Sequence, residues 1–249
     1  MPSVVIDEVF ASLQGEGVRA GQRHIFVRFV GCDLRCRYCD TPAAIGNDDG
    51  PGRLCRAQRT ADSFAWEPVE NPVGPEQLTA LCSRLAVPGP GRPVVSLTGG
   101  EPLLQEEFLA RWLPDVHGRF LIMFETNGIH HKAMASLAPL ADIVSMDMKL
   151  PSATGQRERW SDHERFLAAA GDCELSVKAV VTRGTSIDDV LHAARLTAAA
   201  DPSLPFILQP ASGEAAPPTE TMLAMQRAAL EQLADVRILP QLHRLLSVP

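Results

Sequence analysis

The sequence predicts an α/β fold in which about six parallel strands form a partial, open barrel with helices outside it. From residue 75 onward, helical patterns alternate with short apolar strands, which is typical of a parallel sheet. About six or seven such units are visible, fewer than the eight of a closed barrel. The 249 residues fit a single domain, 1–249. A doubly wound sheet is the alternative.

The expected elements follow one another along the chain. Apolar patterns predict strands at 4–10 and 25–30. Residues 42–75 are rich in Gly, Pro, Asp and Asn, so a loop-rich insertion is expected there. The helices are then expected at 75–87, 105–113, 131–139, 162–170, 186–199 and 219–233. The strands between and after them are expected at 93–97, 120–124, 143–146, 175–181, 205–208 and 236–239.

Charge and composition exclude some classes of protein. The formal net charge is −7, which disfavours a general nucleic-acid-binding role. We find no secretory leader and no 18-residue apolar run, so a cytoplasmic protein that does not associate with membranes is expected. In that compartment, six cysteines indicate metal binding or catalysis rather than disulfides.

Three of the cysteines, Cys32, Cys36 and Cys39, form a C-x3-C-x2-C motif. Three thiolates leave one iron of a four-iron cluster without a cysteine, and such an iron can bind a substrate or cofactor. A zinc site is the alternative, although zinc usually takes four ligands from paired arms. A fully ligated cluster would need Cys55, which we expect to be a loop thiol. Of the others, Cys82 is expected to be buried and Cys173 to lie in a loop or at a strand edge.

Polar side chains follow four of the expected strands at the point where each strand ends, in the segments 98–102, 125–128, 147–149 and 209–212. In α/β barrels these loops meet at one rim and carry the working residues. Gly99 and Gly100 allow a close backbone approach, and the Glu101 carboxylate can accept hydrogen bonds from an ammonium group. We therefore expect one site that the four loops share with the cysteine loop.

The cysteine motif, with Tyr38 before its last cysteine and Gly99-Gly100-Glu101 after the next core strand, resembles the radical S-adenosylmethionine (SAM) superfamily. The resemblance implies that the three cysteines hold a 4Fe–4S cluster. Its open iron would chelate the amino and carboxylate groups of S-adenosyl-L-methionine, and one-electron reduction would release a 5′-deoxyadenosyl radical. It also implies an external one-electron donor, similar to flavodoxin or ferredoxin.

Two further motifs narrow the resemblance. Leu-Gln-Gly-Glu-Gly at 13–17 and Pro-Gln-Leu-His at 240–243 are similar to segments of the 7-carboxy-7-deazaguanine synthase family. This resemblance implies a carbon–nitrogen lyase that converts 6-carboxy-5,6,7,8-tetrahydropterin to 7-carboxy-7-deazaguanine and ammonia. The product belongs to 7-deazapurine (queuosine-type) biosynthesis. A Mg²⁺ ion near the substrate and a homodimer are implied as well.

The resemblance also assigns site residues, with no catalytic side chain beyond the cluster and cofactor. It implies that Thr41 contacts Mg²⁺. The implied cofactor contacts are Tyr38, Cys39, Asp40, Gly100, Glu101, Ser145, Met146, Asp147, Gln209, Pro210, Ala211 and Ser212. The implied substrate contacts are Leu13, Gln14, Gly15, Glu16, Arg28, Thr98, Glu125, His243 and Pro249.

Several of these assignments have structural alternatives. Arg28 suits a bidentate clamp on the pterin carboxylate, but it could instead pair with a carboxylate of the protein. We expect Lys149 to form a supporting ion pair. A basic substrate contact is also expected soon after the cluster loop, and the candidates are Arg53, Arg56 and Arg59.

Two other functions remain open at this stage. A radical activase that acts on a protein glycyl residue would share the cysteine loop, but should lack the pair of terminal motifs. A non-catalytic iron–sulfur or zinc-binding module would have no use for four polar loops on one rim.

Overall fold

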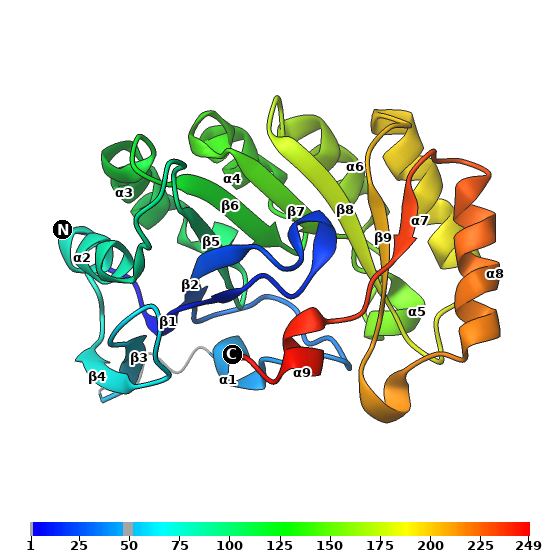
Figure 1. The fold of residues 1–249 in the computed structure, drawn as a ribbon. Helices are drawn as coiled ribbons and strands as arrows, with labels where there is room; N and C mark the ends of the chain where they lie inside the picture. Colours follow the sequence, from blue (N-terminus) through cyan, green and yellow to red (C-terminus); the bar gives the residue numbers. More distant parts are fainter. Residues whose placement is uncertain (1, 47–51) are drawn as a thin grey trace.

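The computed structural model describes residues 2–46 and 52–249, and in these residues one ten-stranded sheet has the order β10-β9-β8-β7-β6-β5-β2-β1-β3-β4 (Figure 1). The strands are β1 (Ile6–Leu13), β2 (Arg23–Phe29), β3 (Leu54–Gln58), β4 (Trp66–Glu70), β5 (Val94–Gly99), β6 (Leu121–Thr126), β7 (Ile143–Asp147), β8 (Glu174–Val181), β9 (Phe206–Pro210) and β10 (Val236–Ile238). The helices are α1 (Pro42–Ile45), α2 (Pro75–Leu85), α3 (Glu106–Val116), α4 (His131–Leu137), α5 (Pro151–Thr154), α6 (Trp160–Ala169), α7 (Ile187–Ala200), α8 (Thr219–Leu230) and α9 (Leu242–Leu246).

The parallel part of the sheet confirms the predicted partial barrel. Strands β2 and β5 to β10 pair in parallel, each with the next. Parallel crossovers are right-handed, so an order that never reverses places the connecting helices on one face of the sheet. Figure 1 shows this arrangement, with α3, α4, α6, α7 and α8 outside the strands. The doubly wound alternative is therefore wrong.

The helices pack on the sheet through narrow apolar faces. In α3 the buried residues are Phe108, Leu109, Trp112, Leu113 and Val116. Their spacing of three to four residues places them on one face of the helix. The indole nitrogen of Trp112 also donates a hydrogen bond to the Thr79 hydroxyl of α2 at 2.9 Å, so the polar edge of this buried ring is satisfied.

The segment 42–75 differs from the expected loop-rich insertion. Residues 47–51 lie outside the described residues, but the rest includes α1 and the antiparallel pair β3 and β4. Strand β3 extends the sheet by pairing in parallel with β1. Cys55 lies within β3 and is fully buried, so the prediction of a loop thiol is wrong. Apolar residues at alternate positions, such as Cys55 and Ala57, were the signal for this strand.

The parallel strands all end at the same rim. The cluster loop follows β2, and the polar segments expected from the sequence follow β5, β6, β7 and β9. Within the described residues, no helix is both long and apolar enough to cross a membrane.

Candidate active site

A cavity of about 640 Å³ opens at the rim where the parallel strands end. Most of the predicted site residues line it, so the strand-end loops and the cysteine loop meet at one cavity, as expected. These residues are Leu13, Gln14, Gly15, Glu16, Arg28, Cys32, Cys36, Tyr38, Cys39, Asp40, Thr41, Thr98, Gly100, Glu125, Ser145, Asp147, Gln209, Ala211, Ser212, His243 and Pro249.

The three cysteines of the motif lie on one wall of the cavity as free thiols. The loop between them is held by its own backbone, with Leu34 N lying 3.5 Å from Cys32 Sγ and Cys39 N donating to Cys36 O at 3.1 Å. Burial raises the pKa of the Cys32 thiol to about 11 and also raises that of Cys36. Thiols bind metals as thiolates, so cation binding at this wall requires these groups to lose their protons.

Gly99 and Gly100 bring the loop after β5 against the base of the cysteine loop. Gly99 has φ +112°, and a Cβ on Gly100 would come within 1.9 Å of Gly31 O. The backbone nitrogens of Gly100 and Glu101 donate to Phe29 O at 3.0 Å and to Gly31 O at 2.8 Å. These glycines therefore allow the backbone after β5 to approach the backbone at the start of the cysteine loop. The contact holds the cysteine loop against β5.

The structure does not bring Glu101 to the cavity, where a contact with an ammonium group was expected. Its side chain is fully buried and is not part of the cavity lining. Its carboxylate accepts hydrogen bonds from Leu103 N at 3.1 Å, Thr126 Oγ1 at 2.7 Å and Asn127 N at 2.7 Å. Glu101 therefore holds the loop after β6 against the loop after β5, beneath the cavity wall.

Met146 and Pro210 also fail to line the cavity, for a different reason. Successive residues of a strand point to opposite faces of the sheet. In β7, Ser145 and Asp147 line the cavity, whereas Met146 is fully buried on the other side. At the end of β9, Gln209 and Ala211 line the cavity, and the same alternation turns Pro210 away from it.

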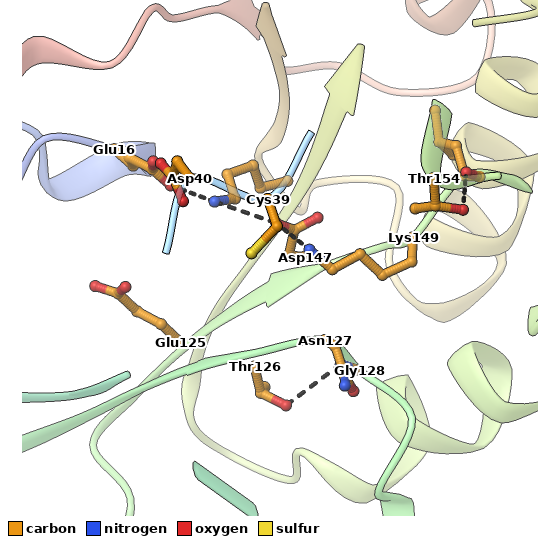
Figure 2. A network of polar contacts seen from close by, with 12 residues as sticks. Glu16, Cys39, Asp40, Glu125, Thr126, Asn127, Gly128, Asp147, Lys149 and Thr154 are labelled. Carbon is orange, nitrogen blue, oxygen red and sulfur yellow. Dashed lines mark hydrogen bonds and ion pairs between the residues drawn. The ribbon is translucent and has the colours of Figure 1, made fainter. Parts of the chain in front are cut away.

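A largely buried network of charges lines the cavity. Lys178 on β8 forms an ion pair with Glu16 and lies 3.3 Å from Asp147, and Asp147 is 2.9 Å from Lys149. Figure 2 shows Lys149 extended toward Asp147, as predicted for a supporting ion pair. Burial opposes ionisation of Glu16, but Lys178 outweighs it and lowers the pKa of Glu16 to about 2. The same carboxylates raise the pKa of Lys178, so the network is charged at neutral pH.

Lys178 was not among the predicted site residues. It lies in the middle of β8, with the apolar residues Val177 and Ala179 on either side. A lysine is almost never fully buried unless it is paired. A lysine at this position of a core strand therefore indicated that a carboxylate lies beside it. Asp147 is that carboxylate, because it is directly opposite Lys178 in the pairing of β7 with β8.

A second group of polar side chains lies on the wall formed by β1, β5 and β6. Glu125 accepts hydrogen bonds from Gln14 Nε2 at 2.7 Å and from Thr98 Oγ1 at 2.9 Å. Burial, together with the nearby charge of Glu16, raises the pKa of Glu125 above its ordinary value. Gln14, Thr98 and Glu125 were predicted separately, and the structure brings them into direct contact.

Gln241 closes the cavity from the side of the C-terminal segment. Its amide nitrogen donates to Glu16 Oε1 at 2.8 Å and to Asp40 Oδ2 at 2.7 Å, while its amide oxygen accepts from Ser212 Oγ at 2.8 Å. It thus joins the loops after β1, β2 and β9. The motif at 240–243 contained this residue, but only His243 was predicted to belong to the site.

Thr41 and its surroundings offer oxygen ligands. Thr41 precedes α1 and makes no side-chain capping bond, and its hydroxyl lies 3.9 Å from Cys39 Sγ. Glu16, Asp40 and His243 can each bring one ligand atom within 4.8 Å of the others. Figure 2 shows Glu16 and Asp40 next to each other.

Arg28 lines the cavity and also forms the ion pair that was the structural alternative, with its Nε 3.1 Å from Glu8 Oε2. The three other arginines considered for a substrate contact do not line the cavity. They pair instead with Asp7, Glu8 and Glu67, and these arginines are Arg53, Arg56 and Arg59.

Comparison with known proteins identifies the class and then the family. The sequence model of the radical SAM superfamily matches residues 26–198, so the chain belongs to that superfamily. A relative from Geobacter sulfurreducens is 37% identical over 99% of this chain and 98% of its own length, and one from Methanothermobacter thermautotrophicus is 34% identical over 98% and 97%. Both are named 7-carboxy-7-deazaguanine synthase, and the chain belongs to this family.

A solved structure shares the fold. The crystal structure of QueE from Escherichia coli covers 97% of this chain and 95% of its own, with a TM-score of 0.55 and 20% sequence identity. The expected partial barrel is confirmed by this likeness as well as by the strand order.

Radical SAM enzymes contain a 4Fe–4S cluster and S-adenosylmethionine, and the cavity fits both groups. Three thiols without disulfide partners lie together on one wall. Two residues that line the cavity each have a buried acceptor atom, Asp147 Oδ1 and Gln209 Oε1, with no hydrogen-bond partner among the described residues. Buried polar atoms are normally paired, so these two are suited to the donors of a bound molecule.

Proposed function

We propose that this chain converts 6-carboxy-5,6,7,8-tetrahydropterin to 7-carboxy-7-deazaguanine and ammonia, the product after which its curated relatives are named. One observation carries the proposal. The three cysteines of the cluster motif and the polar wall of Gln14, Thr98 and Glu125 line the same cavity. A cofactor bound at the cysteines and a heterocycle bound at the polar wall would therefore share one cavity.

When bound, the reduced cluster and S-adenosylmethionine supply a 5′-deoxyadenosyl radical, and the protein's part is to bind, orient and shield. Cys32, Cys36 and Cys39 would hold the cluster. The free acceptors of Asp147 and Gln209 suit the hydroxyl and amino groups of the cofactor. Asp147 is fixed by Lys149 and Lys178, so this side of the cavity is ordered before a ligand arrives.

The opposite wall suits the pterin. Glu125 is held by Gln14 and Thr98, and each of its oxygens retains a lone pair for a further donor. Because its pKa is raised, Glu125 is more readily protonated than an ordinary glutamate, and a carboxyl group that can both donate and accept matches the lactam–amidine edge of a pterin. Arg28 is the cation on this wall, and it suits the pterin carboxylate.

A Mg²⁺ ion is part of the proposal. Magnesium prefers oxygen ligands and keeps several waters, so one or two protein oxygens and a substrate carboxylate suffice. The Thr41 hydroxyl is available, and Asp40 and Glu16 supply carboxylates nearby. On the family resemblance, we also propose a homodimer and an external one-electron donor similar to flavodoxin or ferredoxin.

The test is an anaerobic assay of the protein reconstituted with iron and sulfide. It is given S-adenosylmethionine, a reductant, Mg²⁺ and carboxytetrahydropterin, and 7-carboxy-7-deazaguanine is sought by mass spectrometry. We expect the product, with more of it when Mg²⁺ is present than after chelation. Stoichiometric 5′-deoxyadenosine without 7-carboxy-7-deazaguanine would show that the substrate is wrong.

A further inference from the structure

Glu8 on β1 lies between two arginines of neighbouring strands. It is paired with Arg28 on the antiparallel β2 and with Arg56 on the parallel β3. The carboxylate uses a different oxygen for each neighbour: Oε2 accepts from Arg28 Nε at 3.1 Å, and Oε1 accepts from Arg56 Nη1 at 2.9 Å. The Glu8 side chain is only 19% exposed. Its orientation is therefore fixed from both sides.

A local irregularity of β1 places Glu8 in this position. The pairing between β1 and β2 shifts register between Ile6 and Glu8, as in a β-bulge, which re-aims the following side chain. Glu8 and Phe10 are two residues apart and so share one face of the strand. Arg28 Cζ lies 5.6 Å from the centre of the Phe10 ring, which also lines the cavity. Glu8 and Phe10 thus hold the Arg28 guanidinium together.

This contact decides which edge of Arg28 faces the cavity. A guanidinium is a rigid fork with five N–H donors, and a carboxylate can bind it through two parallel hydrogen bonds. Glu8 occupies the Nε position. The two terminal nitrogens of Arg28 donate no hydrogen bond to any residue that the structure describes, although Arg28 lines the cavity. They form the edge that is left for a carboxylate in the cavity.

Arg56 supports Glu8 from the outer side. Its guanidinium lies 4.5 Å from the centre of the Trp66 ring of β4, within range of a cation–π interaction. Glu8, Arg56 and Trp66 are all absent from the cavity lining. Trp66, Arg56 and Glu8 thus form a chain of contacts that leads from β4 to Arg28, while Trp66 also lies against the Phe10 ring, with the ring centres 6.0 Å apart.

We infer that Glu8 is a positioning residue for substrate recognition, which presents the terminal edge of Arg28 to the substrate carboxylate, and that Arg56 holds Glu8 in place. The inference rests on the proposed function, because it takes the pterin carboxylate as the ligand of Arg28. The Asp7–Arg53 ion pair provides a matched control. Its atoms are 2.5 Å apart and both side chains are 20% exposed. Among the described residues, neither side chain forms a hydrogen bond or ion pair with Arg28, and neither residue lines the cavity.

The experiment compares two ligands on the reconstituted enzyme with S-adenosylmethionine bound. Equilibrium titrations measure the Kd of 6-carboxypterin, and of pterin without the carboxylate, for the wild type, Glu8→Gln, Arg56→Gln and Asp7→Asn. Glu8→Gln weakens the charge-assisted hydrogen bond that orients the Arg28 guanidinium. We therefore expect this variant to bind 6-carboxypterin about tenfold more weakly than the wild type. We expect a smaller loss in the same direction for Arg56→Gln and none for Asp7→Asn. Pterin should bind all four proteins equally, and in turnover Glu8→Gln should raise KM with kcat nearly unchanged.

Several outcomes would overturn the inference. Arg56→Gln carries the same test independently of whether Glu8→Gln folds, and a loss confined to 6-carboxypterin in that variant supports the inference by itself. Equal loss for both ligands, or no loss for either in both variants, contradicts it. If the wild type makes 7-carboxy-7-deazaguanine while Glu8→Gln and Arg56→Gln bind 6-carboxypterin normally, only the positioning role is wrong. If the wild type neither binds 6-carboxypterin nor makes product, the proposed function fails first.

Discussion

The imidazole ring of His243 lies directly against Gly15. A β-carbon on Gly15 would come within 1.9 Å of His243 Nδ1 and 2.9 Å of its Cβ. Beside this contact, Leu242 N donates a hydrogen bond to Gly15 O at 2.8 Å. The loop after β1 and the start of α9 are therefore joined across the cavity, at a distance that only glycine allows.

We expect Gly15→Ala to displace the C-terminal segment from the cavity. The ring and the backbone of His243 would both have to move, so overpacking of about 1–3 kcal/mol is expected at the contact. The KM for the pterin should rise about tenfold, which corresponds to about 1.4 kcal/mol, within that range. Iron content should stay as in the wild type. Gly91→Ala is the control, because its β-carbon would meet nothing within 4 Å. An unchanged KM in Gly15→Ala would contradict the importance of the contact.

Gly100→Ala should damage a different part of the site. Its β-carbon would lie 1.9 Å from Gly31 O and 2.9 Å from Ala44 O, and both are backbone atoms that cannot rotate away. The cysteine loop would be forced off β5, and we expect the variant to bind less iron after reconstitution. Iron and sulfide per chain measure this directly. Gly118→Ala, with open space at its β-carbon, should retain the wild-type content, and a full cluster in Gly100→Ala would refute the prediction.

The shared rim could be predicted from the sequence because parallel strands end on one side of a sheet. Polar residues at the ends of neighbouring parallel strands therefore had to meet, and Thr98 of β5 and Glu125 of β6 do so. Side-chain contacts between residues far apart in the sequence could not be predicted in the same way. Lys178 meets Glu16, 162 positions away, and Gln241 bridges loops from both ends of the chain. Such contacts depend on the strand order and register, which the local pattern does not contain.

Three residues that were predicted to contact the cofactor do not line the cavity, and each has a local reason. Met146 and Pro210 belong to continuous segments that were predicted as a whole, but strand alternation turns them away from the side of the sheet on which their neighbours line the cavity. Glu101 was assigned to a ligand, yet its own loop supplies three donors. Strands β3 and β4 were hidden by the glycines, prolines and aspartates around them. Pairing with β1, rather than intrinsic propensity, makes β3 a strand and buries Cys55.

Cys36→Ala should abolish cluster binding and all activity. Within the described residues, the cysteines outside the motif, which are Cys55, Cys82 and Cys173, do not line the cavity, so none can replace the lost ligand. The visible absorption of the reconstituted protein and its iron content measure the effect. Cys173→Ala is the matched control, since both thiols are half-buried and free. Wild-type iron in Cys36→Ala, or loss of iron in Cys173→Ala, would argue against the three-cysteine site.

The ion pair between Glu16 and Lys178 should stabilise the fold as well as the site. Glu16→Gln leaves a buried lysine with Asp147 as its remaining carboxylate at 3.3 Å, and we expect the free energy of unfolding to fall by about 3 kcal/mol at pH 7. Urea unfolding of the metal-free, reduced protein provides the measurement. Glu174→Gln removes the half-exposed partner of Arg19, and a surface pair of this kind should contribute less than about 1 kcal/mol.

The same pair has a pH dependence of known sign. The pKa of Glu16 in the folded protein is about 2, below its ordinary value of 4.5, so unfolding takes up a proton when the pH lies between these values. The stabilisation is complete above pH 4.5 and is lost as the pH falls toward 2. The difference in unfolding free energy between the wild type and Glu16→Gln should therefore be smaller at pH 3 than at pH 7. A difference that is constant with pH, or that grows on acidification, would show that Glu16 is not held in its ionised form by Lys178.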